Sequence, residues 1–225
     1  LPPALALRPA GAIPELGLPP MVKPLMTAPE TSAIHRIGPN AITRVAEALR
    51  ETSPEERVER PYALAGPPHY LAQPPEKMVE EREVTRLHQV LRDELGIPAA
   101  LEIARSAGVR TGDYLLAHRI PKGVQVLLKW LPARLASQVL LNAIQRHAWT
   151  FAGSGELRVR KTYPPHLAIA GCCICQGAKA ETPLCDFYAA AIERLFQQLV
   201  HPRSRVTETQ CQALGAEACT FEVVW

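Results

Sequence analysis

Residues 206–223 read VTETQCQALGAEACTFEV, and this stretch decides how the C-terminal part of the chain folds. Threonine, valine and phenylalanine near its two ends predict two closing strands, which we place at residues 203–209 and 220–225. Gly215 lies between them, where a residue without a side chain allows the chain to reverse direction. The stretch therefore predicts two strands joined by a short connection.

The same stretch carries metal-binding side chains. Glu208 and Cys211 lie where the first strand ends, and the chain returns to this point at Cys219. Cys185, further upstream, precedes a predicted helix whose N-terminal dipole favours a thiolate. Three thiolates and a carboxylate can complete a tetrahedral Zn²⁺ shell. We therefore expect a structural zinc site near the C-terminus; the alternative is that these cysteines are only small buried residues.

Cys172, Cys173 and Cys175 form a second cluster, in which the first and last have the spacing of a redox or zinc pair. Two further ligands are missing from the neighbouring sequence. Burial at the end of an apolar strand is therefore the favoured interpretation. In the alternative, one of these cysteines replaces Glu208 in the metal shell.

Hydrophobic spacing predicts the elements that precede this region. A helix at 185–200 is expected to bury one apolar face, made of Phe187, Tyr188, Ala191, Ile192, Leu195 and Leu199. The other expected elements are strands at 156–163 and 166–171, a helix at 133–150, a helical stretch from 76 to 151 broken near 96–98, 108–112 and 120–123, a proline-rich surface connection at 52–76, and a short helix at 38–50. The fold class is thus predicted as α+β, with N-terminal helices packed against a small antiparallel sheet.

The N-terminal segment has a different composition. Residues 1–30 contain eight of the 22 prolines, which remove backbone donors and disfavour both helix and central strand. We expect residues 1–34 to form an extended arm and residues 35–225 to form one domain.

The overall composition excludes several classes of protein. With 225 residues, 47% of them hydrophobic and 21% charged, the chain is not disordered throughout. A net charge of +3 is too balanced for an electrostatic nucleic-acid binder. We find neither a run of roughly 20 apolar residues, which a transmembrane helix needs, nor the regions of a signal peptide. We expect a cytoplasmic protein.

Residues 206–223 resemble the closing signature of the 4-vinyl-reductase domain family. In sensory members of that family a metal is held by a cysteine, a Glu-x-x-Cys motif and a last cysteine, and Cys185, Glu208, Cys211 and Cys219 match these positions in order. Residues 114–121, 129–132 and 147–155 resemble instead the BchJ-like, bacteriochlorophyll-pathway members. The resemblance covers residues 35–225 and implies an α/β ligand-binding domain, often dimeric and related to a vesicle-tethering subunit.

The resemblance also implies a role in bacteriochlorophyll biosynthesis, associated with 8-vinyl reduction of divinyl protochlorophyllide. Such a reduction needs a nicotinamide, flavin or Fe–S cofactor, and no G-x-G-x-x-G follows a predicted strand. The expected zinc shell is also saturated. We therefore expect a homodimer that binds a Mg-tetrapyrrole, a porphyrin or chlorophyllide intermediate, and delivers it to pathway enzymes. The alternatives are an 8-vinyl reductase with a partner-supplied cofactor and a small-aromatic sensory or adaptor domain.

A tetrapyrrole site requires an apolar surface, an axial donor for the metal and cations for the propionates. His147 lies on the apolar stripe of the 133–150 helix beside Trp149, and could be that donor. His118 and Arg119 could supply a second donor and a carboxylate contact. The alternatives are a core role for His147 and a solvated surface position for Arg119. A protein with this ligand would also be expected at the periphery of the photosynthetic membrane.

Overall fold

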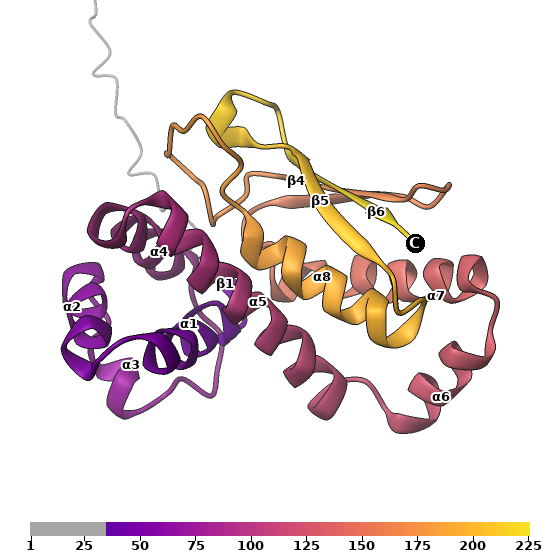
Figure 1. Cartoon of the computed structure of the whole chain (residues 1–225), viewed down its shortest axis with the longest axis horizontal. Coiled ribbons are helices and arrows are strands. Elements are labelled where there is room, and N and C mark those ends of the chain that lie inside the picture. Colours follow the sequence, from indigo (N-terminus) through magenta and orange to yellow (C-terminus); the bar gives the residue numbers. More distant parts are fainter. Residues whose placement is uncertain (1–34) are drawn as a thin grey trace, which may run out of the picture. The chain divides into compact units, whose positions relative to one another are not determined.

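Four strands near the C-terminus form one antiparallel sheet. In the computed structural model, which describes residues 35–225, their order is β3-β4-β6-β5 (Figure 1). The strands are β3 (Glu156–Arg160), β4 (His166–Ala170), β5 (Arg205–Gln210) and β6 (Cys219–Val224). All four lie where the sequence predicts strands. The expected proline-rich arm, residues 1–34, lies outside the described residues.

Helix α8 (Asp186–Leu199) connects β4 to β5 and packs against one face of the sheet (Figure 1). The six residues that the sequence assigns to its apolar face are all buried. Glu193 is also buried, and its carboxylate accepts hydrogen bonds from the Val206 N–H of β5 and from Arg105. The predicted helix that crosses a small sheet is confirmed.

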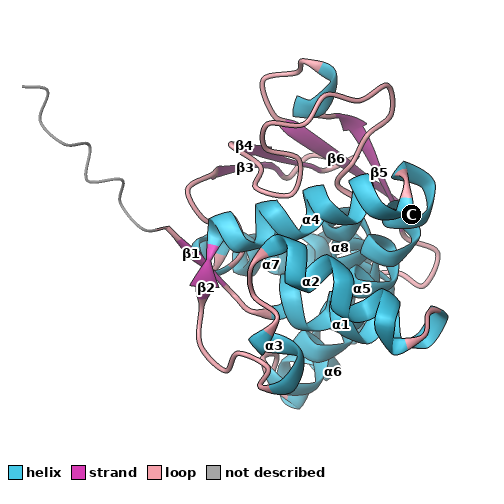
Figure 2. Ribbon diagram, turned by 90° about the vertical axis from the view of Figure 1, so that its left-hand side faces the viewer, coloured by secondary structure: helices cyan, strands magenta, loops and turns pink. Residues whose placement is uncertain are grey.

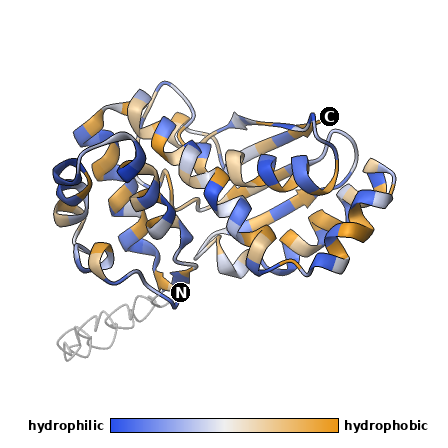
Figure 3. Cartoon of the chain, turned by 60° about the horizontal axis from the view of Figure 1, so that its bottom comes forward, coloured by the Kyte–Doolittle hydropathy of each residue, from blue (hydrophilic) through white to orange (hydrophobic). Residues whose placement is uncertain are grey.

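The remaining elements are mainly helical (Figure 2), which confirms the α+β class. Hydrophilic and hydrophobic residues alternate along these helices (Figure 3), as amphipathic helices require. They are α1 (Asn40–Thr52), α2 (Glu55–Ala65), α3 (His69–Ala72), α4 (Glu81–Leu95), α5 (Ile97–His118), α6 (Lys122–Trp130), α7 (Ala133–Arg146) and the 3₁₀ turn η1 (Ala148–Thr150), with a short pair of strands, β1 (Arg36–Ile37) and β2 (Val79–Glu80).

The surface connection expected at residues 52–76 is wrong, because this segment contains α2 and α3. Pro61 lies inside α2, where it removes one backbone hydrogen bond. Its ring is buried in a stripe with Val58, Tyr62 and Ala65, at helical spacing. The Tyr62 hydroxyl also donates to the Ile42 carbonyl oxygen at 2.6 Å. Packing on α1 therefore outweighs the proline penalty.

The break expected at residues 108–112 is also wrong, since α5 continues from Ile97 to His118. The two glycines in this segment serve helix packing. A Cβ atom at Gly108 would lie 2.3 Å from the Phe187 carbonyl oxygen, and one at Gly112 would lie 2.7 Å from the Arg194 Cβ. These glycines allow α5 and α8 to approach closely.

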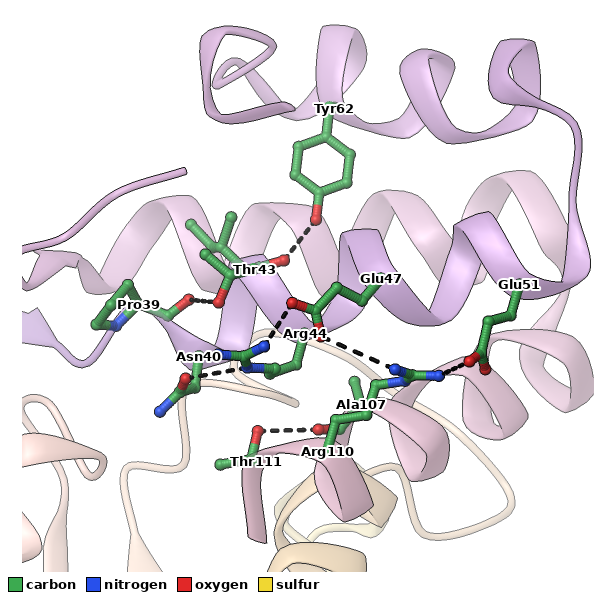
Figure 4. A network of polar contacts seen from close by, with 11 residues as sticks. Pro39, Asn40, Thr43, Arg44, Glu47, Glu51, Tyr62, Ala107, Arg110 and Thr111 are labelled. Carbon is green, nitrogen blue, oxygen red and sulfur yellow. Dashed lines mark hydrogen bonds and ion pairs between the residues drawn. The ribbon is translucent and has the colours of Figure 1, made fainter. Parts of the chain in front are cut away.

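A polar network joins α5 to α1 (Figure 4). Arg110 of α5 forms ion pairs with Glu47 and Glu51 of α1. Arg44 of α1 pairs with Glu47 and lies 4.8 Å from the ring centroid of Tyr114 on α5. With the apolar contacts beneath it, this network connects the N-terminal helices to the long helix that supports α8.

Helix α7 buries a different face from the one that its sequence pattern suggests. Leu135 and Val139 are exposed, whereas Ser137 and Leu141 are buried. The buried face packs against β3 and α8, so the helix is rotated toward these partners. An apolar stripe wide enough for two orientations leaves this choice to the tertiary contacts.

Candidate metal centre

Six cysteines lie in the C-terminal part of the chain, where the connections at one end of the sheet meet α8. All six are free thiols and each is at most 1% exposed. They are Cys172, Cys173 and Cys175 in the turn after β4, Cys185 directly before α8, Cys211 directly after β5, and Cys219 at the start of β6.

The four residues that the sequence assigns to the metal site come together in the structure. One donor atom from each of Cys185, Glu208, Cys211 and Cys219 lies within 4.8 Å of the other three. The Sγ atom of Cys219 is 3.6 Å from that of Cys185 and 3.9 Å from that of Cys211. Tetrahedral Zn–S bonds of about 2.3 Å place sulfur atoms about 3.8 Å apart, so this spacing suits one Zn²⁺ ion.

The Glu208 carboxylate provides an independent test of this fit. Its Oε2 atom accepts a hydrogen bond from the Cys185 N–H at 2.8 Å. Its Oε1 atom is buried and has no hydrogen-bond partner among the described residues. Burial raises the pKa of Glu208 to about 8. A buried carboxylate with one unpaired oxygen beside thiols has the donor chemistry that a bound metal requires.

A second group of four donors overlaps the first. Cys172, Cys175, Cys185 and Cys219 also have their sulfur atoms within 4.8 Å of one another. Cys172 Sγ lies 3.4 Å from Cys185 Sγ, and Cys175 Sγ lies 3.4 Å from Cys219 Sγ. Cys172 and Cys175 are thus buried, as expected, and also reach the predicted site. Their spacing in the sequence was the available signal.

Cys173 has a different environment, although it lies between these two cysteines in the sequence. Its Sγ atom is 3.3 Å from the Tyr188 hydroxyl, which donates to the Phe151 carbonyl oxygen. Cys173 belongs to neither four-residue group. The interpretation as a buried small residue therefore fits Cys173 alone.

Polar groups around the sulfur atoms favour negative charge. The Gln212 N–H donates to Cys219 Sγ at 3.4 Å, and the Gln212 side chain accepts from the Cys172 N–H at 2.7 Å. Arg92 of α4 donates through Nη1 to the Ile174 carbonyl oxygen, while its buried Nη2 has no partner among residues 35–225. Burial lowers the pKa of Arg92, and Cys175 and Cys185 oppose this effect. The sequence offered no signal for Arg92, which lies 80 residues or more from the cysteines.

The four residues expected to bind a tetrapyrrole are exposed and lie at the ends of the α6–α7 segment. His118 and Arg119 precede α6, whereas His147 and Trp149 follow α7. His147 is therefore not a core residue. Its Nδ1 atom lies 2.8 Å from the Ala143 carbonyl oxygen, so Nδ1 carries the proton and Nε2 is the free donor.

The segment between these residues presents a large apolar surface, which we call the α6–α7 face. Its large hydrophobic residues are 40% to 84% exposed, and Trp130 is the most exposed. Residues 114–155 contain five Lys or Arg side chains and no Asp or Glu. The residues of the face are Val124, Val126, Leu127, Trp130, Leu135, Val139 and Trp149.

The outer face of the sheet carries an open cavity of about 480 Å³, for which the sequence gave no expectation. Its lining is mainly polar and includes Arg158, Arg160 and His166. His166 Nε2 lies 3.1 Å from a Glu222 carboxylate oxygen. Among residues 35–225, no helix combines the length and the hydropathy of a membrane-spanning segment.

Comparison with known proteins places the chain among its relatives. The family model of the 4-vinyl-reductase domain matches residues 165–224, which include all six cysteines. The chain is 44% identical over 190 residues to the bacteriochlorophyll synthase 23 kDa chain of Cereibacter sphaeroides, covering 84% of this chain and 91% of that protein. It is 38% identical over 186 residues to the protein of the same name in Rhodobacter capsulatus, covering 83% and 85%.

A more distant relative matches only part of the chain. It is an uncharacterised protein of Methanocaldococcus jannaschii, 32% identical over 69 residues, which cover 31% of this chain and 38% of that protein. The high coverage of the two bacteriochlorophyll synthase relatives and the domain match at the cysteine-rich end agree with each other. The chain therefore belongs to the family of bacteriochlorophyll synthase 23 kDa chains, which carry a 4-vinyl-reductase domain.

Proposed function

We propose that this protein acts in bacteriochlorophyll biosynthesis by binding a Mg-tetrapyrrole intermediate and delivering it to a pathway enzyme. The observation that carries the proposal is the 44% identity, over 91% of its length, to a protein named as a chain of bacteriochlorophyll synthase. Porphyrin and chlorophyllide intermediates are the substrates of such a pathway. The fold must then offer a surface for a large, flat and mostly apolar ligand.

The α6–α7 face has the properties of that surface. Exposed tryptophans such as Trp130 and Trp149 can stack on a macrocycle, and the uncompensated cations can pair with its carboxylates. His147 supplies an axial donor, because its hydrogen bond to the Ala143 carbonyl leaves Nε2 free to bind Mg²⁺. His118 and Arg119 remain the second donor and the carboxylate contact of the proposal.

The metal centre is assigned a structural role. Its thiols are at most 1% exposed, and each four-residue group offers a full tetrahedral shell with no open position for substrate. Zn²⁺, if bound there, would hold the ends of β5, β6 and α8 together. This arrangement supports a carrier over an 8-vinyl reductase, which would require a redox cofactor from a partner.

A titration with Mg-protoporphyrin, followed by the shift of its Soret band, tests the proposal. His147→Ala should weaken binding of the Mg-porphyrin by about 1–3 kcal/mol, the scale of one directed contact, and metal-free porphyrin should be affected much less. His166→Ala, on the outer face of the sheet, is the matched control and should bind as wild type.

Other outcomes would favour other functions. Equal losses for both porphyrins in His147→Ala would remove its role as an axial donor. Binding of phenols without porphyrin binding would favour the sensory alternative. Catalytic turnover of divinyl protochlorophyllide by the pure protein with NADPH would favour the reductase. The proposed location is the cytoplasm, at the periphery of the photosynthetic membrane, where the cationic α6–α7 face suits anionic lipid.

A further inference from the structure

The two groups of metal donors share a pair of sulfur atoms. Cys185 and Cys219 belong to both, while Cys172 with Cys175 completes one group and Glu208 with Cys211 completes the other. A single tetrahedral ion uses four of these six donors. Whichever group it occupies, two buried donors are left beside it without a ligand.

The distances show that each shared sulfur has neighbours on both sides. Cys219 Sγ lies 3.4 Å from Cys175 Sγ and 3.9 Å from Cys211 Sγ. Cys185 Sγ lies 3.4 Å from Cys172 Sγ, and the Cys185 N–H contacts the carboxylate of Glu208. The shared sulfurs are 3.6 Å apart. This is the arrangement of two tetrahedra that share an edge, and a thiolate has enough lone pairs to bridge two ions.

We propose that the centre binds two Zn²⁺ ions, bridged by Cys185 and Cys219, with Cys172 and Cys175 as the outer ligands of the second ion. The first ion takes Glu208 and Cys211 as its outer ligands. The second site goes beyond the function proposed above, and neither depends on the other. Cysteine sulfurs occupy the bridging positions, so inorganic sulfide is not needed.

The charges are compatible with two ions. With one ion bound by Glu208 and three thiolates, Cys172 and Cys175 remain neutral thiols. A second Zn²⁺ brings two positive charges and replaces two thiol protons, which pass to solvent. The net charge of the centre is therefore unchanged. The Arg92 guanidinium lies within electrostatic reach of Cys175, Cys185 and Cys211 and balances part of the remaining negative charge.

Metal content per chain gives the first test. The full-length protein, purified under reducing conditions with Zn²⁺, should contain two tightly bound Zn²⁺ ions by native mass spectrometry and elemental analysis. The double variant Cys172→Ser/Cys175→Ser should keep one. Cys173→Ser is the matched control, because this neighbouring buried thiol belongs to neither group, and it should keep two. One ion in both wild type and the double variant would overturn the proposal.

Cobalt substitution tests the bridges without any variant, in case the double variant fails to fold. Stepwise addition of Co²⁺ to metal-free protein should give sulfur-to-cobalt absorption that saturates at two equivalents. The paramagnetic resonance signal should grow up to one equivalent and then fall, since bridging thiolates couple the two spins. A signal that keeps growing to saturation would show independent ions and contradict shared ligands. Saturation at one equivalent would exclude the second site.

Discussion

At the scale of single residues, burial decides what each polar side chain contributes. Glu208 and Cys173 show the contrast. Glu208 is half-buried and keeps one oxygen without a protein partner among residues 35–225, which suits a metal ligand. Cys173 is fully buried and already contacts the Tyr188 hydroxyl. Burial raises its pKa, so this thiol stays protonated and packs as a small apolar residue.

His88 gives a prediction about pH. Its ring is 2% exposed and packs edge-on against Phe187, and burial lowers the pKa of His88 to about 3. Because the unfolded chain binds this proton near pH 6.5, the stabilising effect of the neutral ring is present at pH 7 and is lost as the pH falls. Between pH 7 and pH 5 the loss is about 2 kcal/mol.

His88→Leu should remove that part of the pH dependence. Urea unfolding of the metal-loaded protein at pH 7 and pH 5 measures it, and the variant should lose less stability than wild type by about 2 kcal/mol. His69→Leu, at an exposed position, serves as the control and should follow wild type. An identical pH dependence in His88→Leu and wild type would show that His88 is not the titrating group.

At the scale of elements, helix contacts override local preference. The pattern in the sequence placed α8 and the four strands of the sheet correctly, because their apolar residues face one partner each. It failed for α2, where Pro61 is tolerated in a packed stripe, and for α5, where glycines indicate close packing rather than a break. In both cases the residue type describes the isolated chain, whereas a neighbouring helix decides the outcome.

Gly108→Ala tests this explanation of α5. Alanine favours a helix over glycine by about 1 kcal/mol, but its Cβ would lie 2.3 Å from the Phe187 carbonyl oxygen of α8. We expect a net destabilisation of about 1–3 kcal/mol, measured by urea unfolding. Gly123→Ala in α6 is the matched control, because nothing lies within 4 Å of the added atom, and it should stabilise by up to about 1 kcal/mol. Stabilisation by both variants would refute the close-packing argument.

At the scale of the whole molecule, the metal centre joins segments that are far apart in the sequence. Its donors come from the turn after β4, the start of α8, the end of β5 and the start of β6. Arg92 connects the same turn to α4 through its bond to the Ile174 carbonyl oxygen. Without metal, five thiols and a carboxylate crowd one buried region, and their charges cannot be balanced.

Metal removal should therefore loosen one part of the protein first. After chelation under reducing conditions, hydrogen exchange should increase most in β5, β6 and the first turn of α8. Amides of α1 and α5, which share their own core and the Arg110 ion pairs, should keep more of their protection. Re-addition of Zn²⁺ should restore the protection. Unchanged exchange near the cysteines would argue against a structural role. The homodimer implied by the family remains a prediction, and sedimentation of the loaded protein tests it.

By itself, the sequence determined the α+β class, the strands of the sheet, helix α8, and four donors for a metal at one end of that sheet. These features follow from local periodicity and from short, ordered spacings that any fold of this chain must respect. Only the tertiary structure decided that Cys172 and Cys175 reach the same site and that Cys173 does not. It also decided that His147 is exposed and that Arg92 lies beside the thiols. Such proximities join residues separated by up to 80 or more positions. Packing of whole elements creates these proximities, because the spacing of residues along the chain does not fix them.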